Sequence, residues 1–182
     1  MFRRSFVILI AGMAWSGCSS DTGDPKVGEC ADYCALVTKH CSATVSQYGD
    51  GDACMATCLA LPEGDQTAHS GNTIACRTFE AAAAEFDPTV CPKAGPGGDG
   101  VCGNNCDSFC QLADTICVGE LAAYASTAEC LTACAGFTST PPFDSGDTAG
   151  NTFECRLYHL TAASAIPRVH CPHIGVVSPV CN

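Results

Sequence analysis

Two apolar runs rich in Ala, the second of which also contains Leu, predict the clearest helices of this 182-residue chain. They span 74–86 and 153–166, and a proline follows each run within two residues, where a helix is expected to stop. Gly-Asn-Thr precedes both runs, at 71–73 and at 150–152. Asn or Thr at such a place can cap a helix by accepting an orphan backbone N–H. The two runs therefore indicate one helix type that occurs twice.

The cysteines repeat in the same way. Sixteen of the 17 form one eight-cysteine pattern written twice, and each copy opens with gaps of 3, 6, 12 and 3 residues. Chance does not reproduce four gaps without error. The first copy comprises Cys30, Cys34, Cys41, Cys54, Cys58, Cys76, Cys91 and Cys102, and the second comprises Cys106, Cys110, Cys117, Cys130, Cys134, Cys155, Cys171 and Cys181. The pattern predicts two tandem repeats, 30–102 and 103–182.

Cysteine spacing also predicts a helical hairpin in each repeat. At about 100° per residue, the first three cysteines of a copy fall on one stripe of a helix, and the next two form a short stripe on a second helix. The rise between the paired positions is about 6 Å on both helices, so an antiparallel hairpin would bring them into register. This geometry favours Cys30–Cys58, Cys34–Cys54, Cys106–Cys134 and Cys110–Cys130 as a hypothesis among many connectivities.

The remaining cysteines lie near the third helix and in the loops that follow it. Cys76 and Cys155 fall in the first turn of that helix, where Cys41 and Cys117 are expected to reach them. Elimination then gives the pairs Cys41–Cys76, Cys117–Cys155, Cys91–Cys102 and Cys171–Cys181. The predicted fold class is all-α: two tandem, disulfide-stapled three-helix repeats with long loops.

Charge narrows the choice of partners. Eight Lys and Arg residues oppose 19 Asp and Glu residues, for a net charge of −11. Such a surface repels nucleic acid, which proteins bind through clustered cations. It also disfavours attraction to anionic lipid. Solubility is the simplest role for this charge, and a site for a basic partner is the alternative.

The seventeenth cysteine, Cys18, has different surroundings. Arg3 and Arg4 precede an apolar stretch at 6–15, and Ser16-Gly17 stand directly before the cysteine. The segment resembles a bacterial lipoprotein signal peptide, too short to span a bilayer. The resemblance implies that residues 1–17 are removed, that Cys18 is acylated, for example with palmitate, and that 18–29 form a lipidated tether. An ordinary secretory signal cut elsewhere is the alternative.

The resemblance to a lipoprotein implies a location in the bacterial cell envelope, on the extracytoplasmic side. Ser19 after the cysteine resembles lipoproteins that are sent on to an outer membrane. An oxidising compartment agrees with an even set of cysteines at fixed spacings, which is typical of disulfides. The expected partners are the membrane, through the lipid anchor, and an unidentified envelope or extracellular protein.

Histidines distinguish the second repeat from the first. His159 lies on the third helix of repeat two, and His170 and His173 flank Cys171. The corresponding residues of repeat one are Glu80, Val90 and Lys93. Because an opposite-charge pair replaces His159 and His173, we expect these two positions to lie close together. Three convergent imidazoles could ligate zinc or copper, whereas the alternative is three surface histidines and no cofactor.

The remaining residues with chemical potential give little sign of catalysis. No hydrolase, phosphate-binding-loop or dinucleotide-binding motif occurs, and the disulfide pattern leaves no thiol for a cysteine nucleophile. Arg77 and Arg156 follow equivalent cysteines, and we expect both to be structural ion-pair partners. The chain is therefore expected not to be an enzyme, with an unrecognised hydrolase as an alternative.

Repeat two also carries a recognisable segment, Cys-Arg-Leu-Tyr-His at 155–159 followed by His-Cys-Pro-His at 170–173. It resembles cysteine-rich bacterial envelope lipoproteins with tandem CxxxC repeats, a group with no assigned activity. The resemblance implies location and organisation only. The expected function is a non-catalytic binding or scaffold module at the membrane, with zinc or copper binding by the histidines as the first alternative.

Overall fold

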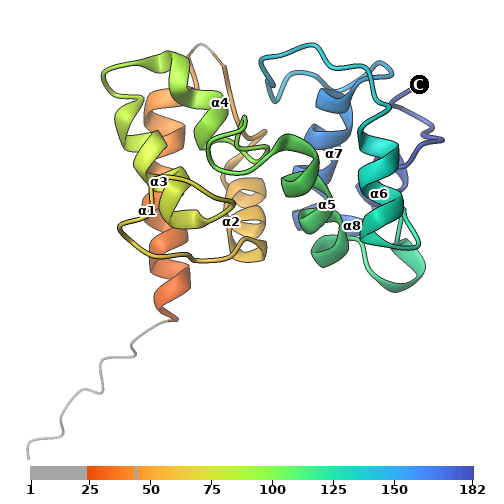
Figure 1. Ribbon diagram of the computed structural model, residues 1–182, viewed down its shortest axis with the longest axis horizontal. Helices are drawn as coiled ribbons and strands as arrows, with labels where there is room; N and C mark the ends of the chain where they lie inside the picture. Colours follow the sequence, from red (N-terminus) through yellow and green to blue (C-terminus); the bar gives the residue numbers. More distant parts are fainter. Residues whose placement is uncertain (1–23, 44) are drawn as a thin grey trace, which may run out of the picture.

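The computed structural model describes residues 24–43 and 45–182, and all of its regular elements are helices (Figure 1). The predicted signal peptide and Cys18 lie outside the described residues. Repeat one contains α1 (Pro25–Cys41), α2 (Gly51–Ala60), α3 (Ile74–Ala83), η1 (Pro88–Val90) and α4 (Cys91–Ala94). Repeat two contains α5 (Asn105–Ile116), η2 (Gly119–Leu121), α6 (Thr127–Cys134), α7 (Phe153–Ala165), α8 (Pro167–His170) and η3 (Cys171–His173). The all-α, duplicated fold is confirmed.

Side-chain caps begin the third helix of each repeat, as the sequence predicts. The Thr73 hydroxyl accepts from the backbone N–H of Cys76 at 3.2 Å, and the Thr152 hydroxyl accepts from that of Cys155 at 3.1 Å. Each cap satisfies one of the orphan N–H groups at a helix start. In the described part of the chain, no helix is long and apolar enough to cross a membrane.

Disulfides join the first two helices of each repeat into the predicted hairpin. Their pairs are those that the helical spacing favours, Cys30–Cys58, Cys34–Cys54, Cys106–Cys134 and Cys110–Cys130. The Cα atoms of these pairs are 5.6 to 5.9 Å apart. Every one of these cysteines except the half-buried Cys106 is buried, so the sulfur pairs are part of the core.

The other four disulfides differ from the predicted ones. The structure has Cys41–Cys91, Cys76–Cys102, Cys117–Cys171 and Cys155–Cys181. The expected pairs Cys41–Cys76, Cys91–Cys102, Cys117–Cys155 and Cys171–Cys181 are therefore wrong.

Helix direction explains the difference. Cys41 ends α1, and α4, which follows α3, packs against α1 and brings Cys91 to it. The loop after α4 then returns to the start of α3, where Gly71 N–H donates to the Val101 carbonyl at 3.0 Å. That return brings Cys102 to Cys76.

Both third-helix arginines are buried, but their partners are not acids. Arg77 donates to the carbonyl oxygens of Gly95, Thr73 and Pro96 at 3.0 to 3.2 Å. Arg156 is held in the same manner, and its guanidinium also lies 4.0 Å from the ring centroid of Phe137. The expectation of ion pairs is wrong, because backbone carbonyls and uncharged side-chain oxygens satisfy these donors, with the Ser108 hydroxyl serving Arg77 and the Asn151 amide oxygen serving Arg156. Each arginine fixes a C-terminal loop to the third helix.

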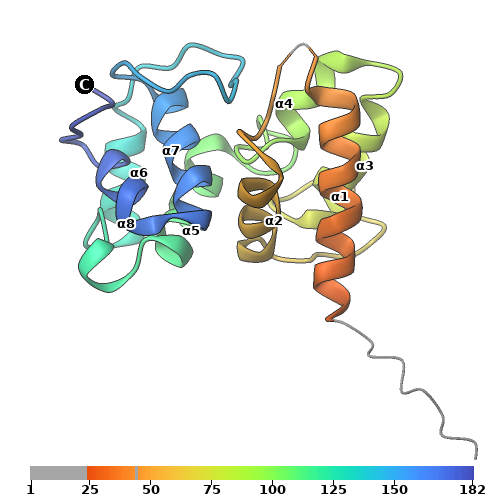
Figure 2. The ribbon, with the colours of Figure 1, turned by 180° about the vertical axis from the view of Figure 1, so that it is seen from behind.

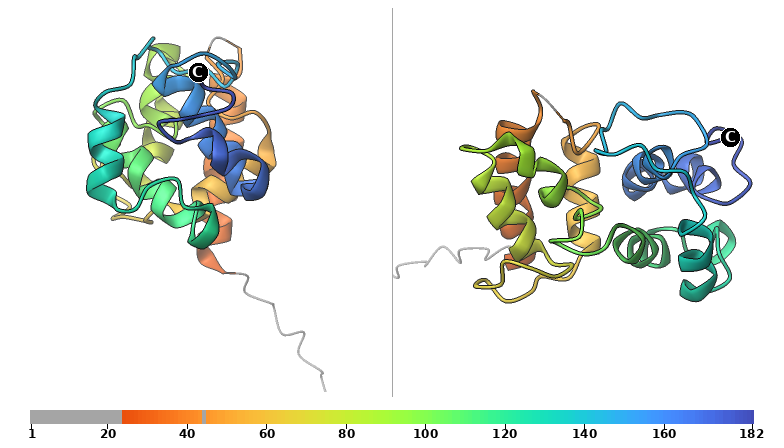
Figure 3. Two further views of the ribbon diagram at one scale, coloured as in Figure 1. Left: turned by 90° about the vertical axis from the view of Figure 1, so that its right-hand side faces the viewer. Right: turned by 45° about the horizontal axis from the view of Figure 1, so that its top comes forward.

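The repeats stack along the long axis of the molecule. Figure 1 shows α1 and α3 at one end, then α2, then α5 and α7, with α6 toward the other end; Figure 2 and the turned views of Figure 3 give the same order. Helix α2 of repeat one packs against α7 and α5 of repeat two. At this junction the Thr57 hydroxyl lies 3.2 Å from the Ser164 hydroxyl, and Ser145 N–H donates to the Ser46 carbonyl at 2.7 Å.

Candidate metal centre

The three histidines of repeat two come together at one point. His159 lies on α7, His170 ends α8 and His173 ends η3. The Nδ1 atom of His159 is 2.9 Å from Nδ1 of His170 and 3.2 Å from Nδ1 of His173. One ring nitrogen from each histidine lies within 4.8 Å of the other two. The predicted convergence of these residues is present in the structure.

Short helices and one disulfide hold His170 and His173 in place. Both α8 and η3 have a proline in their first turn, which suits a helix start because proline has no N–H to satisfy. The Cys117–Cys171 disulfide ties the residue between the two histidines to the end of α5. The Tyr124 hydroxyl donates to the Ile174 carbonyl directly after η3. Of these groups, the disulfide has a direct counterpart in repeat one, Cys41–Cys91.

The tautomer of His159 follows from its surroundings. Its Nε2 lies 3.2 Å from the Thr148 carbonyl, which can only accept a hydrogen bond. Nε2 therefore carries the proton in the neutral ring, and Nδ1 presents a lone pair to both neighbours. That single lone pair can accept from only one of the two facing Nδ1 atoms. A bound cation would satisfy all three nitrogens at once.

The spacing of the nitrogens suits a transition metal. Zn–N bonds of about 2.0–2.1 Å place two nitrogens of a tetrahedral site about 3.3–3.4 Å apart. The observed 2.9 and 3.2 Å need only a small opening of the cluster to reach that value. The Thr148 carbonyl would act as the outer partner that orients the first ligand, an arrangement common among metal-binding histidines.

Burial favours the neutral form of His159 and His170. Desolvation first, and then the neighbouring His173, lower the pKa of His159 to about 4, although the hydrogen bond to Thr148 opposes the shift. Desolvation and His173 also lower the pKa of His170. Metals bind the neutral imidazole, so protons compete weakly with a metal here at neutral pH.

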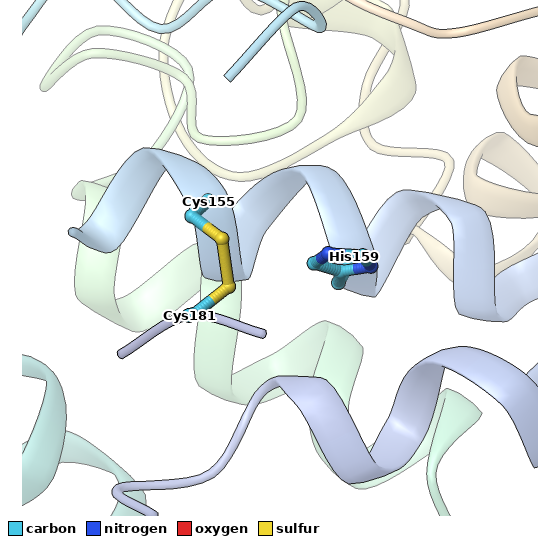
Figure 4. A group of neighbouring side chains, drawn as sticks. All are labelled: Cys155, His159 and Cys181. Carbon is cyan, nitrogen blue, oxygen red and sulfur yellow. A yellow bond between two sulfur atoms is a disulfide. The ribbon is translucent and has the colours of Figure 1, made fainter. Parts of the chain in front are cut away.

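A disulfide lies directly beside His159. Figure 4 shows the Cys155–Cys181 bridge one helical turn before His159 on α7. Both sulfur atoms and a ring nitrogen of His159 lie within 4.8 Å of one another. Because the sulfurs are joined to each other, they offer no thiolate to a metal. The bridge therefore lines the site without being a ligand. Among the described residues, neither of the two side-chain clusters that could hold a metal ion includes a carboxylate.

Repeat one lacks such a cluster within the described residues. Glu80 is buried and Lys93 is half-buried, and no salt bridge joins these two described residues. The opposite charges therefore do not form the pair that their sequence positions suggested. The comparison of the repeats pointed to the right three histidines in repeat two. It gave no indication of the Thr148 carbonyl, because a backbone acceptor has no sequence signature.

The fold and the cluster define a class: tandem-repeat, disulfide-stapled helical proteins in which one repeat carries a histidine cluster. A family model described as the BfoA family C-terminal domain matches residues 28–105 and again residues 103–178. The chain belongs to this family and contains two tandem copies of its domain. A search of the curated proteins and a search of the solved structures found no match.

Proposed function

We propose that this protein is a non-catalytic extracytoplasmic binding module that holds a zinc or copper ion with His159, His170 and His173. The observation that carries the proposal is the convergence of three Nδ1 atoms on one point, with only one lone pair of His159 for two facing rings. Three imidazoles leave a fourth position for water or an exchangeable ligand. Such a site favours reversible capture of the ion over a closed structural role.

Several features support a place in the bacterial envelope. Eight disulfides are typical of an oxidising compartment. Acylation of Cys18 would keep the module at a membrane. The intact mass of the mature protein purified from membranes tests this acylation. A mass without acyl chains, or a mature chain that starts at another residue, would contradict the anchor.

The metal site is tested by equilibrium titration of the metal-free protein with zinc and with copper(II), against a chelating competitor. We expect one ion per chain and an affinity at least about tenfold lower for His159→Ala, since one of three ligands is lost. His40→Ala is the matched control, because His40 lies at the end of α1 and outside the cluster. Equal affinities for both variants and the wild type would sink the proposal.

Repeat one suggests a second test, with substitutions that the fold should tolerate. A triple variant that places the residues of repeat one in repeat two, His159→Glu, His170→Val and His173→Lys, removes all three imidazoles. Each replacement already occupies the corresponding place in a folded repeat. We expect this variant to keep its helical content and thermal stability and to lose tight metal binding.

A further inference from the structure

The junction between the repeats has a counterpart at the far end of the molecule. When the repeats are aligned on their cysteines, Thr57 corresponds to Ala133, Asn72 to Asn151 and Arg77 to Arg156. In repeat one, these residues face repeat two. Thr57 is fully buried against Ser164, and Asn72 donates to the side chain of Gln111 at 2.6 Å. Arg77 reaches the Ser108 hydroxyl at 3.5 Å.

The same surface of repeat two is uncovered. Here a groove of about 310 Å³ runs between α6 and the start of α7. We call it the open groove; it is lined by Thr132, Ala133, Gly136, Phe137, Thr138, Asn151, Arg156 and Val176. Leu61 of repeat one, which corresponds to Phe137, is buried, whereas Phe137 is only half-buried. The groove is therefore the vacant equivalent of the surface that packs repeat one on repeat two.

The opposite end of the molecule presents the complementary surface. In repeat two, α5 and α7 cover repeat one with residues that include Ser108, Gln111 and Tyr158. Their equivalents in repeat one lie on α1 and α3, at the other end of Figure 1. We call this surface the front face; it comprises Asp32, Ala35, Phe79 and Ala82 on these two helices and Phe86, three residues after α3 ends, all of them exposed.

Apolar exposure on the front face is high. Phe86 is 86% exposed and Phe79 is 43% exposed, with the ring of His69 stacked on Phe79 at 3.7 Å between centroids. Tyr158, which corresponds to Phe79, is half-buried beside Gly49 and Asp50 of repeat one. Large exposed apolar side chains on one surface commonly mark a binding site.

Charge complementarity favours a second copy of this chain as the partner that binds the open groove. Asp32 stands where repeat two has Ser108, the residue that Arg77 reaches across the junction. Arg156, the equivalent of Arg77, lines the open groove, and none of its five hydrogen-bond acceptors is a carboxylate. Repeating the internal junction between two copies would bring Asp32 of one copy to Arg156 of the other.

We propose that this protein self-associates head to tail, with the front face of one copy seated in the open groove of the next. The contact repeats the internal packing of the two repeats, so α1 and α3 of one molecule take the places of α5 and α7. Such an interface is heterologous, and each added copy leaves one groove and one front face free. The inference does not depend on the metal site, which lies elsewhere in repeat two.

Sedimentation velocity over a range of concentrations tests the proposal, with three matched substitutions to aspartate in the purified protein. Phe86→Asp changes the front face, Ala133→Asp changes the groove, and Val118→Asp changes a residue that is 58% exposed and outside both surfaces. We expect the wild type and Val118→Asp to form dimers and larger species as concentration rises. Each of the other variants alone should associate at least about tenfold more weakly.

Mixing the variants gives the decisive result. Phe86→Asp retains a groove and Ala133→Asp retains a front face, so an equimolar mixture should form a dimer and stop there. Recovery of association also shows that both variants are folded. A wild-type protein that stays monomeric, or a mixture that fails to associate although the wild type does, would overturn the proposal. Association unchanged by Asp32→Lys would contradict the contact between Asp32 of one copy and Arg156 of the next.

Discussion

At the scale of single residues, protonation decides what the histidine cluster can bind. His159 is 5% exposed, and its Nε2 proton is committed to the Thr148 carbonyl. Adding a second proton at Nδ1 would place a cation next to two further imidazoles in a poorly solvated position. The same lone pair is the one that a metal would use, so proton and metal compete for a single atom.

The metal-free protein should therefore lose stability on mild acidification. Burial and the neighbouring rings lower the pKa of His159 to about 4 in the folded state, against an ordinary value of 6.5. The unfolded chain binds the proton first, so the free energy of unfolding falls as the pH drops from about 6.5 to about 4 and then levels off. Nuclear magnetic resonance titration of the ring carbons gives the pKa directly. A midpoint for His159 near 6.5 in the folded protein would contradict this expectation.

The control for this pH dependence is His159→Asn, which cannot titrate. Denaturant unfolding of this variant should show a smaller fall in stability over the same pH range. An unchanged slope would assign the pH dependence to other groups.

At the scale of elements, two equivalent disulfides, one in each repeat, should differ in their effect on metal binding. Cys41–Cys91 and Cys117–Cys171 occupy equivalent places and close similar sequence separations of 50 and 54 residues. Only Cys117–Cys171 includes a cysteine with a histidine on each side, because His170 and His173 flank Cys171. A matched pair of variants can therefore separate stability from ligand geometry.

Replacing Cys117 and Cys171 together by alanine should lower metal affinity about tenfold or more, because α8 and η3 lose their tie to α5. Replacing Cys41 and Cys91 should leave the affinity unchanged. Both double variants should lose about 4 kcal/mol of unfolding free energy by chain entropy alone. Zinc titration and denaturant unfolding check the two effects. Equal metal affinity in both variants would show that the bridge does not position the ligands.

These elements also show how far the sequence predicts the structure. Equal four-residue spacings on two helices determine the two disulfides of each hairpin, because the helix rise per residue fixes how far apart the cysteines lie along each helix. No such rule relates Cys41 to Cys76 or Cys91, since the direction of α3 relative to α1 depends on tertiary packing. The histidine cluster was predictable from the contrast between repeats, whereas the open groove required the three-dimensional equivalence of α2 and α6.

At the scale of the whole molecule, the two repeats share one junction. Thr57 is fully buried there, with its hydroxyl 3.2 Å from that of Ser164. The half-buried side chains of Asn72 and Gln111 also share a hydrogen bond at this junction. Packing of this kind couples neighbouring units, so each repeat stabilises the other.

Thr57→Asp should therefore weaken both repeats together. A buried carboxylate without a cationic partner costs about 2–4 kcal/mol, and the loss should appear in a single unfolding transition if the repeats are coupled. Ala133→Asp, the equivalent change on α6, should cost less than about 0.5 kcal/mol because the groove is open. Calorimetry at low protein concentration measures both variants. Two separate transitions in Thr57→Asp, one at the wild-type temperature, would show that the repeats are independent.

The disulfide connectivity has one further consequence, which concerns backbone cleavage. Each of the eight bridges closes within its own repeat, and only Gly103, Asn104 and Asn105 connect Cys102 to Cys106. A single cut in this three-residue link would leave the sixteen paired cysteines in two pieces with no covalent bond between them. The pieces would then stay together only through the noncovalent contacts of the junction. No disulfide among the described residues joins the two repeats, so a protease acting at one short link could release the histidine-bearing half from any anchor on the other.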